Sequence, residues 1–225
     1  MIETNEDLGE WTNRIVKECH TEYPVRAFGD NFKTCVDVGA NVGGFIMNYH
    51  DLFEEIHAYE ASSQNISRCK SNLEYMNISN VVFNHAAVHS DDGEILKLKK
   101  HNNTENCGSY GVVDFTNSEG HGWDDECEYE EVGSVSLESI IETVGEIDVL
   151  KVDIEGAEFE FLYEKDLSSI GIIFIEVHNF LTEMGVGNKL VDWILKTHKY
   201  GGGKYLPFYK EYHQQLIFLN NNLNK

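Results

Sequence analysis

The amino-acid sequence predicts an α/β protein whose sheet is doubly wound and mostly parallel, with helices on both faces. Short apolar runs alternate along the chain with segments whose apolar residues recur at helical spacing, and this alternation is typical of βαβ units. The first apolar run ends in a glycine-rich turn at residues 37–44 that leads directly into a helical pattern. Crossovers in such a sheet are right-handed, and ligands bind beyond the carboxyl ends of its strands.

The first half of the chain contains three predicted core strands, at residues 32–38, 56–60 and 81–88. A helix over residues 43–53 is predicted between the first two strands. Residues 94–100 alternate like an edge strand after an Asp-Gly turn at 92–93. Apolar residues at helical spacing predict one helix before the first strand (Leu8, Trp11, Ile15 and Cys19) and another after the second strand (Ile66, Cys69, Leu73 and Met76).

The second half resumes the alternation after a long polar segment at about residues 101–131. Ser136 has the residue type and position of an N-cap for a helix over 137–143. The remaining predicted elements are strands at 147–152 and 171–177, helices at 157–163 and 189–196, and a closing pair of strands at 204–209 and 215–219.

Length and composition indicate a single domain. The chain has 225 residues, is 41% hydrophobic, and contains two prolines and no Ser/Gly-rich linker at which it could be divided. We therefore expect an N-terminal helical extension over residues 1–30 and one domain over 31–225. We also expect the acidic segment at about 101–131 to be an insertion in that domain and, with Tyr110 and Trp123, to cover a ligand.

The charge of the chain disfavours nucleic-acid partners. Lys and Arg number 17 and Asp and Glu number 39, so the net charge is 17 − 39 = −22. Nucleic-acid binding draws on phosphate–cation contacts, which such a surface opposes. We therefore expect no nucleic-acid substrate.

Membrane insertion and export are not expected either. No apolar run approaches the ~18 residues of a membrane span, and residues 1–10 are acidic and polar, unlike a signal peptide. The five cysteines are odd in number and include no C-x-x-C pair, which favours reduced thiols over zinc ligands or disulfides. These features predict a cytoplasmic protein.

The turn at residues 37–44 predicts a cofactor site. Gly39, Ala40, Asn41 and Gly43 bring the backbone close to a ligand at the start of a helix. The pattern Gly-x-Asn-x-Gly fits the dinucleotide motif Gly-x-Gly-x-x-Gly poorly. Asp37 would repel a pyrophosphate but suits a ligand with an ammonium group, such as S-adenosylmethionine. We expect Asp37 and the turn to hold the amino-acid end of that cofactor.

Two further positions complete the predicted cofactor site. Glu60 ends the second strand, where a carboxylate can accept hydrogen bonds from both hydroxyls of a ribose. Ala61 follows it, and Ala86 lies near the end of the third strand, where small residues can border an adenine ring.

Charged residues gather at the ends of two later strands. Lys151, Asp153 and Glu155 share one side of an extended segment, and Glu176 and His178 share one side of the next strand. Burying so many charges beside apolar strands is costly unless they pair or contact a ligand. The sequence therefore predicts a reactive site at this rim.

Four segments in this order and spacing resemble the FkbM-type methyltransferases, over roughly residues 31–219. They are DVGANVG at 37–43, Tyr59-Glu60 with Asn65, LKVDIEGAE at 150–158 and IEVH at 175–178. The resemblance implies a class I methyltransferase domain over 31–225, with a seven-stranded Rossmann-like sheet, a C-terminal antiparallel strand and bound S-adenosylmethionine. It also implies methyl transfer to a hydroxyl, typically on a sugar, glycan or polyketide-like acceptor. The family commonly has proline after the second-strand acid, where this chain has Ala61.

The resulting hypothesis is an S-adenosylmethionine-dependent O-methyltransferase. His178 is the first choice of general base because an imidazole pKa lies near working pH, and Lys151 is the second choice if burial lowers its pKa. Asp153 would contact the cofactor ammonium or orient the acceptor. In an alternative that we do not favour, Asp153, Glu155 and His178 ligate Mg²⁺ and acidify the hydroxyl.

Two rival functions remain. A non-catalytic S-adenosylmethionine-binding module would have little use for the charged strand ends. A nicotinamide-dependent dehydrogenase on a similar sheet is disfavoured by Asp37 and Asn41.

Overall fold

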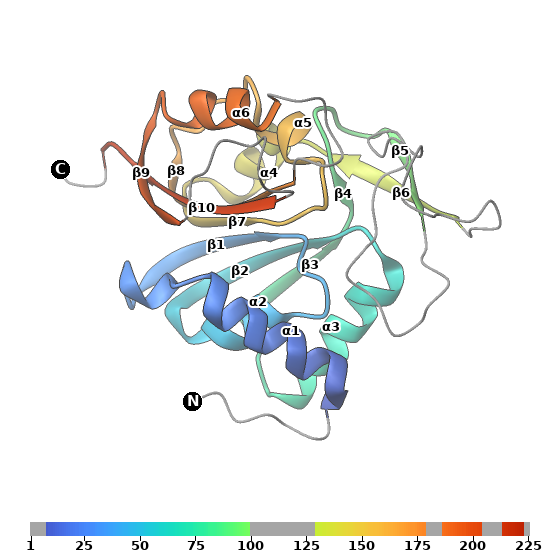
Figure 1. The fold of residues 1–225 in the computed structure, drawn as a ribbon. Helices are drawn as coiled ribbons and strands as arrows, with labels where there is room; N and C mark the ends of the chain where they lie inside the picture. The colour runs from blue at the N-terminus through green and yellow to red at the C-terminus, as the bar shows by residue number, and fades with distance from the viewer. Residues whose placement is uncertain (1–7, 100–128, 179–185, 204–212, 223–225) are drawn as a thin grey trace.

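The computed structural model describes residues 8–99, 129–178, 186–203 and 213–222. Its main feature is a seven-stranded sheet in the order β3-β2-β1-β7-β8-β10-β9 (Figure 1). Every pairing from β3 to β8 is parallel, whereas β10 is antiparallel to both of its neighbours. The predicted fold class, including the antiparallel C-terminal strand, is confirmed. The strands are β1 (Phe32–Val38), β2 (Phe53–Glu60), β3 (Val81–His85), β7 (Ile147–Val152), β8 (Ile170–His178), β9 (His198–Gly203) and β10 (His213–Asn220).

Helices cover both faces of this sheet. In Figure 1, α1, α2 and α3 lie on one face and α4, α5 and α6 on the other. Two short 3₁₀ helices, Val25–Ala27 and His50–Leu52, lie in connections. The helices are α1 (Gly9–Glu22), α2 (Gly44–Tyr49), α3 (Ser63–Tyr75), α4 (Leu137–Val144), α5 (Glu158–Leu162) and α6 (Val186–Ile194).

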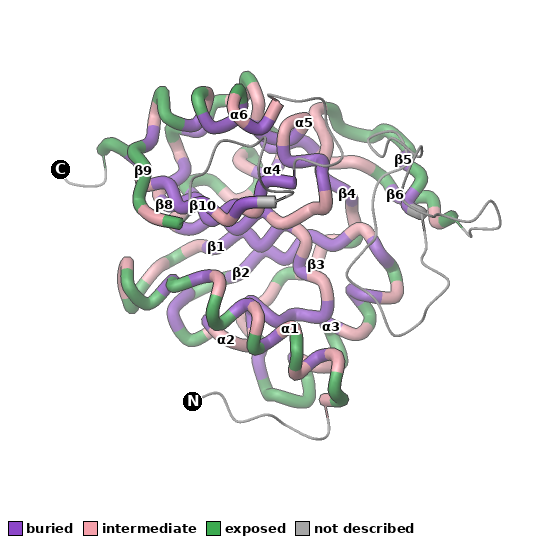
Figure 2. Tube along the Cα trace, viewed as in Figure 1, coloured by how far each residue is buried: buried purple, intermediate pink, exposed green. Residues whose placement is uncertain are grey.

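Alternate residues of the central strands supply two separate cores. In β8, Ile173, Ile175 and Val177 pack with α4, α5 and α6, whereas Ile172 and Phe174 pack on the α1 side. The period of two in a strand produces this division. Figure 2 shows the resulting band of buried residues along the sheet. Glu176 and His178 therefore point to the α1 side, opposite Ile175 and Val177, as the sequence predicted.

A second, three-stranded sheet in the order β4-β6-β5 extends from the end of β3. Its strands are β4 (Ala87–Val88), β5 (Ile95–Lys99) and β6 (Tyr129–Val135). The prediction of a single strand at 81–88 is wrong, since this segment forms two strands. The Ala86 amide donates a hydrogen bond to the Glu60 carbonyl, and after it the chain leaves β2 and pairs with β6. The predicted polar loop also ends earlier than expected, since β6 begins at Tyr129.

The structure confirms a predicted helix cap, corrects the position of a predicted strand and does not describe the predicted covering loop. Ser136 caps α4 by accepting a hydrogen bond from the Ser139 amide at 3.2 Å, which confirms the predicted N-cap. The penultimate strand, predicted at 204–209, is formed by His198–Gly203, and residues 204–212 lie outside the described part. The covering loop with Tyr110 and Trp123 also lies outside the described residues.

The N-terminal helix α1 packs against α2, and glycine makes this packing close. A Cβ on Gly44 would lie 2.6 Å from a methyl carbon of Ile15 and 3.2 Å from Cys19 Sγ. The absence of a side chain therefore lets α1 lie directly beside the start of α2. This contact places α1 next to the carboxyl ends of the central strands.

Within the described residues, none of the helices is both long and apolar enough to cross a membrane.

Candidate active site

Two hollows meet at the carboxyl ends of the central strands. The first, which we call the β2 hollow, includes Tyr59 and Glu60 of β2. The second, the α1 hollow, lies between α1 and the ends of β7 and β8. Gly39, Asn41, Asp153 and Glu155 line both. A ligand that fills the first hollow thus ends where the second begins.

The turn after β1 forms the floor between the hollows. The amides of Gly39 and Ala40 both donate to the Tyr59 carbonyl, at 2.9 and 3.0 Å. Gly39 has φ +77°, and a Cβ there would lie 1.9 Å from the Asp153 carbonyl oxygen, so only glycine fits. Ala40 lines the α1 hollow. Gly43 lines neither hollow. It has φ +92° and lies so close to Cys69 that a Cβ would be 2.9 Å from its Sγ.

Glu60 lies where the sequence placed it, on the wall of the β2 hollow with Ala61 and Ala86. One carboxylate oxygen accepts a hydrogen bond from the Asn41 amide and the other from the Ser62 amide, both at 2.8 Å. Burial raises the pKa of Glu60, and these two amides oppose that rise. The carboxylate is therefore fixed in orientation at the hollow.

Asp37 lies behind the glycine turn and not on the wall of either hollow. Its side chain is fully buried and lines neither hollow. Asp37 and Lys151 are direct partners on the neighbouring strands β1 and β7, and Oδ1 lies 3.2 Å from Lys151 Nζ. Lys151 is thus the ion-pair partner of Asp37, although both carboxylate oxygens lack a hydrogen-bond partner within the described structure.

Lys151 is likewise unsuited to the role of base. Burial by itself lowers the pKa of Lys151, but the carboxylates of Asp37 and Asp153 more than offset it, so the pKa is raised above its usual value. Its Nζ also donates to the Gly39 carbonyl at 2.7 Å. Lys151 is a permanent ammonium that ties the glycine turn to β7, although it reaches the wall of the α1 hollow.

Asp153 is held in place by a residue that the sequence did not identify. The hydroxyl of Tyr23 donates to Asp153 Oδ2 at 3.2 Å, and Lys151 Nζ lies 3.9 Å from the same oxygen. Tyr23 is buried just beyond α1 and belongs to no recognisable motif. Only the folded chain, with a separation of 130 residues, brings the two together.

Charged side chains of both signs line the α1 hollow. Its described walls carry five carboxylates and two permanent cations. Both cations have carboxylate partners: Arg14 pairs with Glu18 at 2.7 Å and Lys151 with Asp37. The carboxylates are those of Glu18, Glu22, Asp153, Glu155 and Glu176.

His178 lies at the inner end of this hollow, surrounded by acids. Its Nδ1 lies 2.8 Å from Glu158 Oε1, and its Nε2 lies 3.6 Å from Glu155 and 3.7 Å from Glu176. Burial alone would lower the pKa of His178, but Glu158 and then Glu155 and Asp153 raise it to about 10. These carboxylates thus favour the protonated ring over the neutral form that a general base requires.

Two carboxylates beside His178 instead have pKa values near neutrality. Burial is the main reason that the pKa values of Glu155 and Glu176 are each raised to about 7, and Asp153 adds to both shifts. Glu155 also has a left-handed backbone, with φ +53°, which is unusual for a residue with a side chain. Glu155 thus combines an unusual backbone conformation with a position where the two hollows meet.

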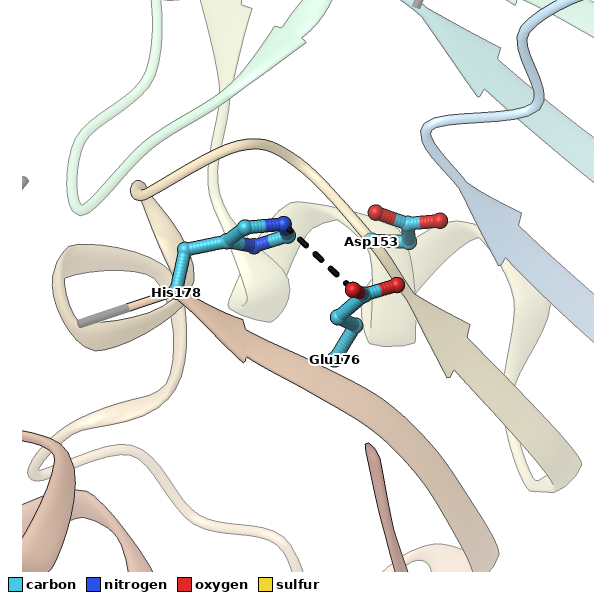
Figure 3. Close-up of side chains that lie close together, drawn as sticks. All are labelled: Asp153, Glu176 and His178. Carbon is cyan, nitrogen blue, oxygen red and sulfur yellow. Dashed lines mark ion pairs between the residues drawn. The ribbon is translucent and has the colours of Figure 1, made fainter. Parts of the chain in front are cut away.

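One described group could share a metal ion, and it differs from the predicted set. Single donor atoms of Asp153, Glu176 and His178 all lie within 4.8 Å of one another (Figure 3). The sequence predicted Glu155 as the second carboxylate ligand, whereas in the structure Glu176 completes the group. Figure 3 shows His178 and Glu176, at the end of β8, facing Asp153 at the end of the neighbouring strand.

Comparisons with known proteins agree with this architecture. A family model described as "Methyltransferase FkbM domain" matches residues 37–215. No curated protein matches the chain. Many solved structures resemble it; two with TM-scores of 0.52 and 0.50 share 13% identity with this chain, a level that shows the fold alone.

The first solved structure is the methyltransferase FkbM from Methylobacillus flagellatus KT, with 13% identity and a TM-score of 0.52 over 93% of this chain and 55% of that one. The second is Trm5b from Pyrococcus abyssi, with 13% identity and a TM-score of 0.50 over 92% and 49%. The third is TrmK from M. capricolum in complex with S-adenosyl-homocysteine, with 10% identity and a TM-score of 0.49 over 93% and 67%. The chain spans about half the length of the first two.

Proposed function

The chain belongs to the FkbM methyltransferase family, and we propose that it transfers a methyl group from S-adenosylmethionine to a hydroxyl of a sugar, glycan or other small-molecule acceptor. The observation that supports this most is the junction of the two hollows at Gly39, Asn41, Asp153 and Glu155. A nucleoside cofactor on one side and an acceptor on the other would meet there.

The β2 hollow has groups that suit the cofactor. The fixed carboxylate of Glu60 can accept hydrogen bonds from both ribose hydroxyls, and Ala61 and Ala86 leave room for a flat base. Asn41 Oδ1 is buried and lacks a hydrogen-bond partner within the described structure. It is an acceptor well placed for the cofactor's ammonium group, the part first assigned to Asp37.

When bound, S-adenosylmethionine supplies an electrophilic methyl group: a lone pair of the acceptor oxygen bonds to the methyl carbon, and the C–S bond breaks with its electrons going to sulfur. The residues of the chain must hold the acceptor in line and take the hydroxyl proton. Glu155 takes that proton in our proposal, because it lies at the junction and its pKa of about 7 suits a base at neutral pH. Asp153, fixed by Tyr23, orients the acceptor.

The charge of the chain restricts the acceptor. The net charge of −22 would repel phosphates, carboxylates and nucleic acids. Neutral sugars offer hydroxyl donors, which carboxylates bind directly. A neutral polyol is therefore the acceptor class that the charges favour.

Calorimetry followed by a transfer assay tests the proposal and separates it from its rivals. Binding of S-adenosylhomocysteine but not NADH is expected, which excludes a dehydrogenase. Neutral glycans should then gain a methyl group, detected by mass spectrometry. Cofactor binding with no transfer to any glycan would favour a non-catalytic binding module, and failure to bind S-adenosylhomocysteine would contradict the proposal itself.

A further inference from the structure

The small sheet β4-β6-β5 borders the β2 hollow together with the main sheet. Leu98 of β5 and Val88 of β4 both line that hollow. Leu98 is only 1% exposed and belongs to an apolar cluster of the small sheet, against which Ala61 packs from the turn after β2. The small sheet therefore contacts the turn that directly follows Glu60.

Glu130 of β6 makes a second, polar contact with the same turn. It is the register partner of Leu98 in the antiparallel pair of β5 and β6, so the two side chains lie on one face of the small sheet. Glu130 Oε1 accepts a hydrogen bond from the Ser63 amide at 3.0 Å. The same oxygen lies 3.5 Å from His85 Nε2, which is 2.9 Å from the Ala61 carbonyl oxygen. Side chains of β3 and β6 thus hold the turn at residues 61–63.

We propose that Glu130 is a positioning residue of the cofactor site: from the small sheet it fixes the turn at residues 61–63, and this turn fixes the carboxylate of Glu60 toward the ribose. Glu130 does not line the β2 hollow, so it acts through the turn and not on the cofactor itself. This role rests on the proposed function, in which Glu60 binds the ribose hydroxyls.

Two consecutive backbone amides connect Glu130 to Glu60. Glu60 Oε1 accepts from the Ser62 amide at 2.8 Å, and Glu130 Oε1 accepts from the next amide, that of Ser63. Peptide units are planar and adjacent ones share a Cα atom, so fixing one amide restricts the direction of the other. Without the bond from Ser63, the Ser62 amide and the Glu60 carboxylate that it holds would have more freedom to turn.

The position of Glu130 at the start of α3 favours this contact. Ser63 is the first residue of α3, and the first amides of a helix have no acceptor within the helix. Ser62 Oγ accepts from the Asn65 amide at 3.3 Å, and Glu130 accepts from the Ser63 amide. The helix dipole also favours a carboxylate at this end. Asn65 itself lines the β2 hollow, so the start of α3 and the ribose turn form one wall.

A pair of ligands tests this role without an acceptor. The full-length chain would be titrated by calorimetry with S-adenosylhomocysteine and with its 2′-deoxyribose analogue, which lacks one hydroxyl that Glu60 would accept. We expect the wild type to prefer S-adenosylhomocysteine by on the order of tenfold. In Glu130→Ala this preference should fall to on the order of threefold or less. An unchanged preference would overturn the proposal even if both affinities fell, because a general loosening of the fold weakens both ligands equally.

Two further variants address the same hydrogen bond. Glu130→Gln keeps an oxygen for the Ser63 amide and should retain most of the preference. Ser63→Pro removes the donor, and proline suits the first position of a helix. The extended backbone of Ser62, with φ −80° and ψ 120°, is compatible with a following proline. Ser63→Pro should lose the preference as Glu130→Ala does, and the double variant should lose little more. A full additional loss in the double variant would contradict a shared contact.

The matched control is Glu131→Ala, the exposed neighbour on the other face of β6, which should keep the wild-type preference. The outcomes separate this role from the proposed function. A wild type that does not bind S-adenosylhomocysteine would refute the proposed function. A wild type that binds both ligands equally would refute the ribose contact of Glu60 and the role of Glu130 with it. A wild-type preference that Glu130→Ala retains would refute the role of Glu130 alone.

Discussion

The affinity for S-adenosylhomocysteine should depend strongly on Glu60, and Glu60→Gln is the change that tests this. Each oxygen of Glu60 accepts one backbone amide, from Asn41 and from Ser62, at 2.8 Å. In the glutamine variant one oxygen becomes an NH₂ group that faces an amide donor, so one of these bonds is lost and the side chain must turn. The variant also loses charge-assisted hydrogen bonds to the ribose, which contribute about 1.5–3 kcal/mol.

This loss corresponds to a reduction in affinity on the order of 10- to 100-fold, because each 1.4 kcal/mol is a factor of ten. Isothermal titration calorimetry at fixed pH and salt measures it directly. Glu54→Gln, an exposed acid on the same strand, is the matched control and should bind normally. If Glu60→Gln binds S-adenosylhomocysteine as tightly as the wild type, the ribose is not held by Glu60 and the β2 hollow is not the nucleoside site.

Three further changes test other parts of the site. Glu155→Gln should lower kcat by on the order of 100-fold with cofactor affinity unchanged. In the wild type, kcat should rise with pH through about 7, because Glu155 must lose its proton to act as base; a flat profile between pH 5.5 and 8.5 would argue for another base. Gly39→Ala should destabilise the protein by about 2 kcal/mol or more in urea unfolding, because its Cβ would overlap the Asp153 carbonyl at a positive φ. Gly133→Ala, with open space around the new Cβ, should be close to neutral, and equal effects of the two would contradict the close approach. Dialysis against EDTA should leave methyl transfer intact, because in our proposal Glu155 accepts the hydroxyl proton without a metal ion; loss of activity that Mg²⁺ restores would support the metal mechanism instead.

Local patterns were sufficient to predict the architecture. Apolar runs with a period of two and helical segments with a period near 3.6 depend on neighbouring residues only, so they can be recognised before the fold is known. Where a strand changes partner, as between β3 and β4, no local pattern marks the break. Its position depends on β6, more than 40 residues away in the sequence.

The candidate site was predicted in part. Glu60, Ala61 and Ala86 do line one hollow, and Asp153, Glu155 and His178 do line the other, because residues at strand ends are placed by topology. Tyr23 could not be found in this way. Its contact with Asp153 joins residues 130 positions apart and leaves no pattern in either segment.

The sequence by itself determined which residues lie at the carboxyl ends of the strands and on which face they point, since backbone geometry dictates both. Tertiary structure alone decided their charge states and partners. Asp37 lies 3.2 Å from the ammonium of Lys151, and Glu158 Oε1 lies 2.8 Å from His178 Nδ1, where it raises the pKa of the ring. The physical reason is that burial and neighbouring charges set a pKa, and neither exists until distant segments have packed together.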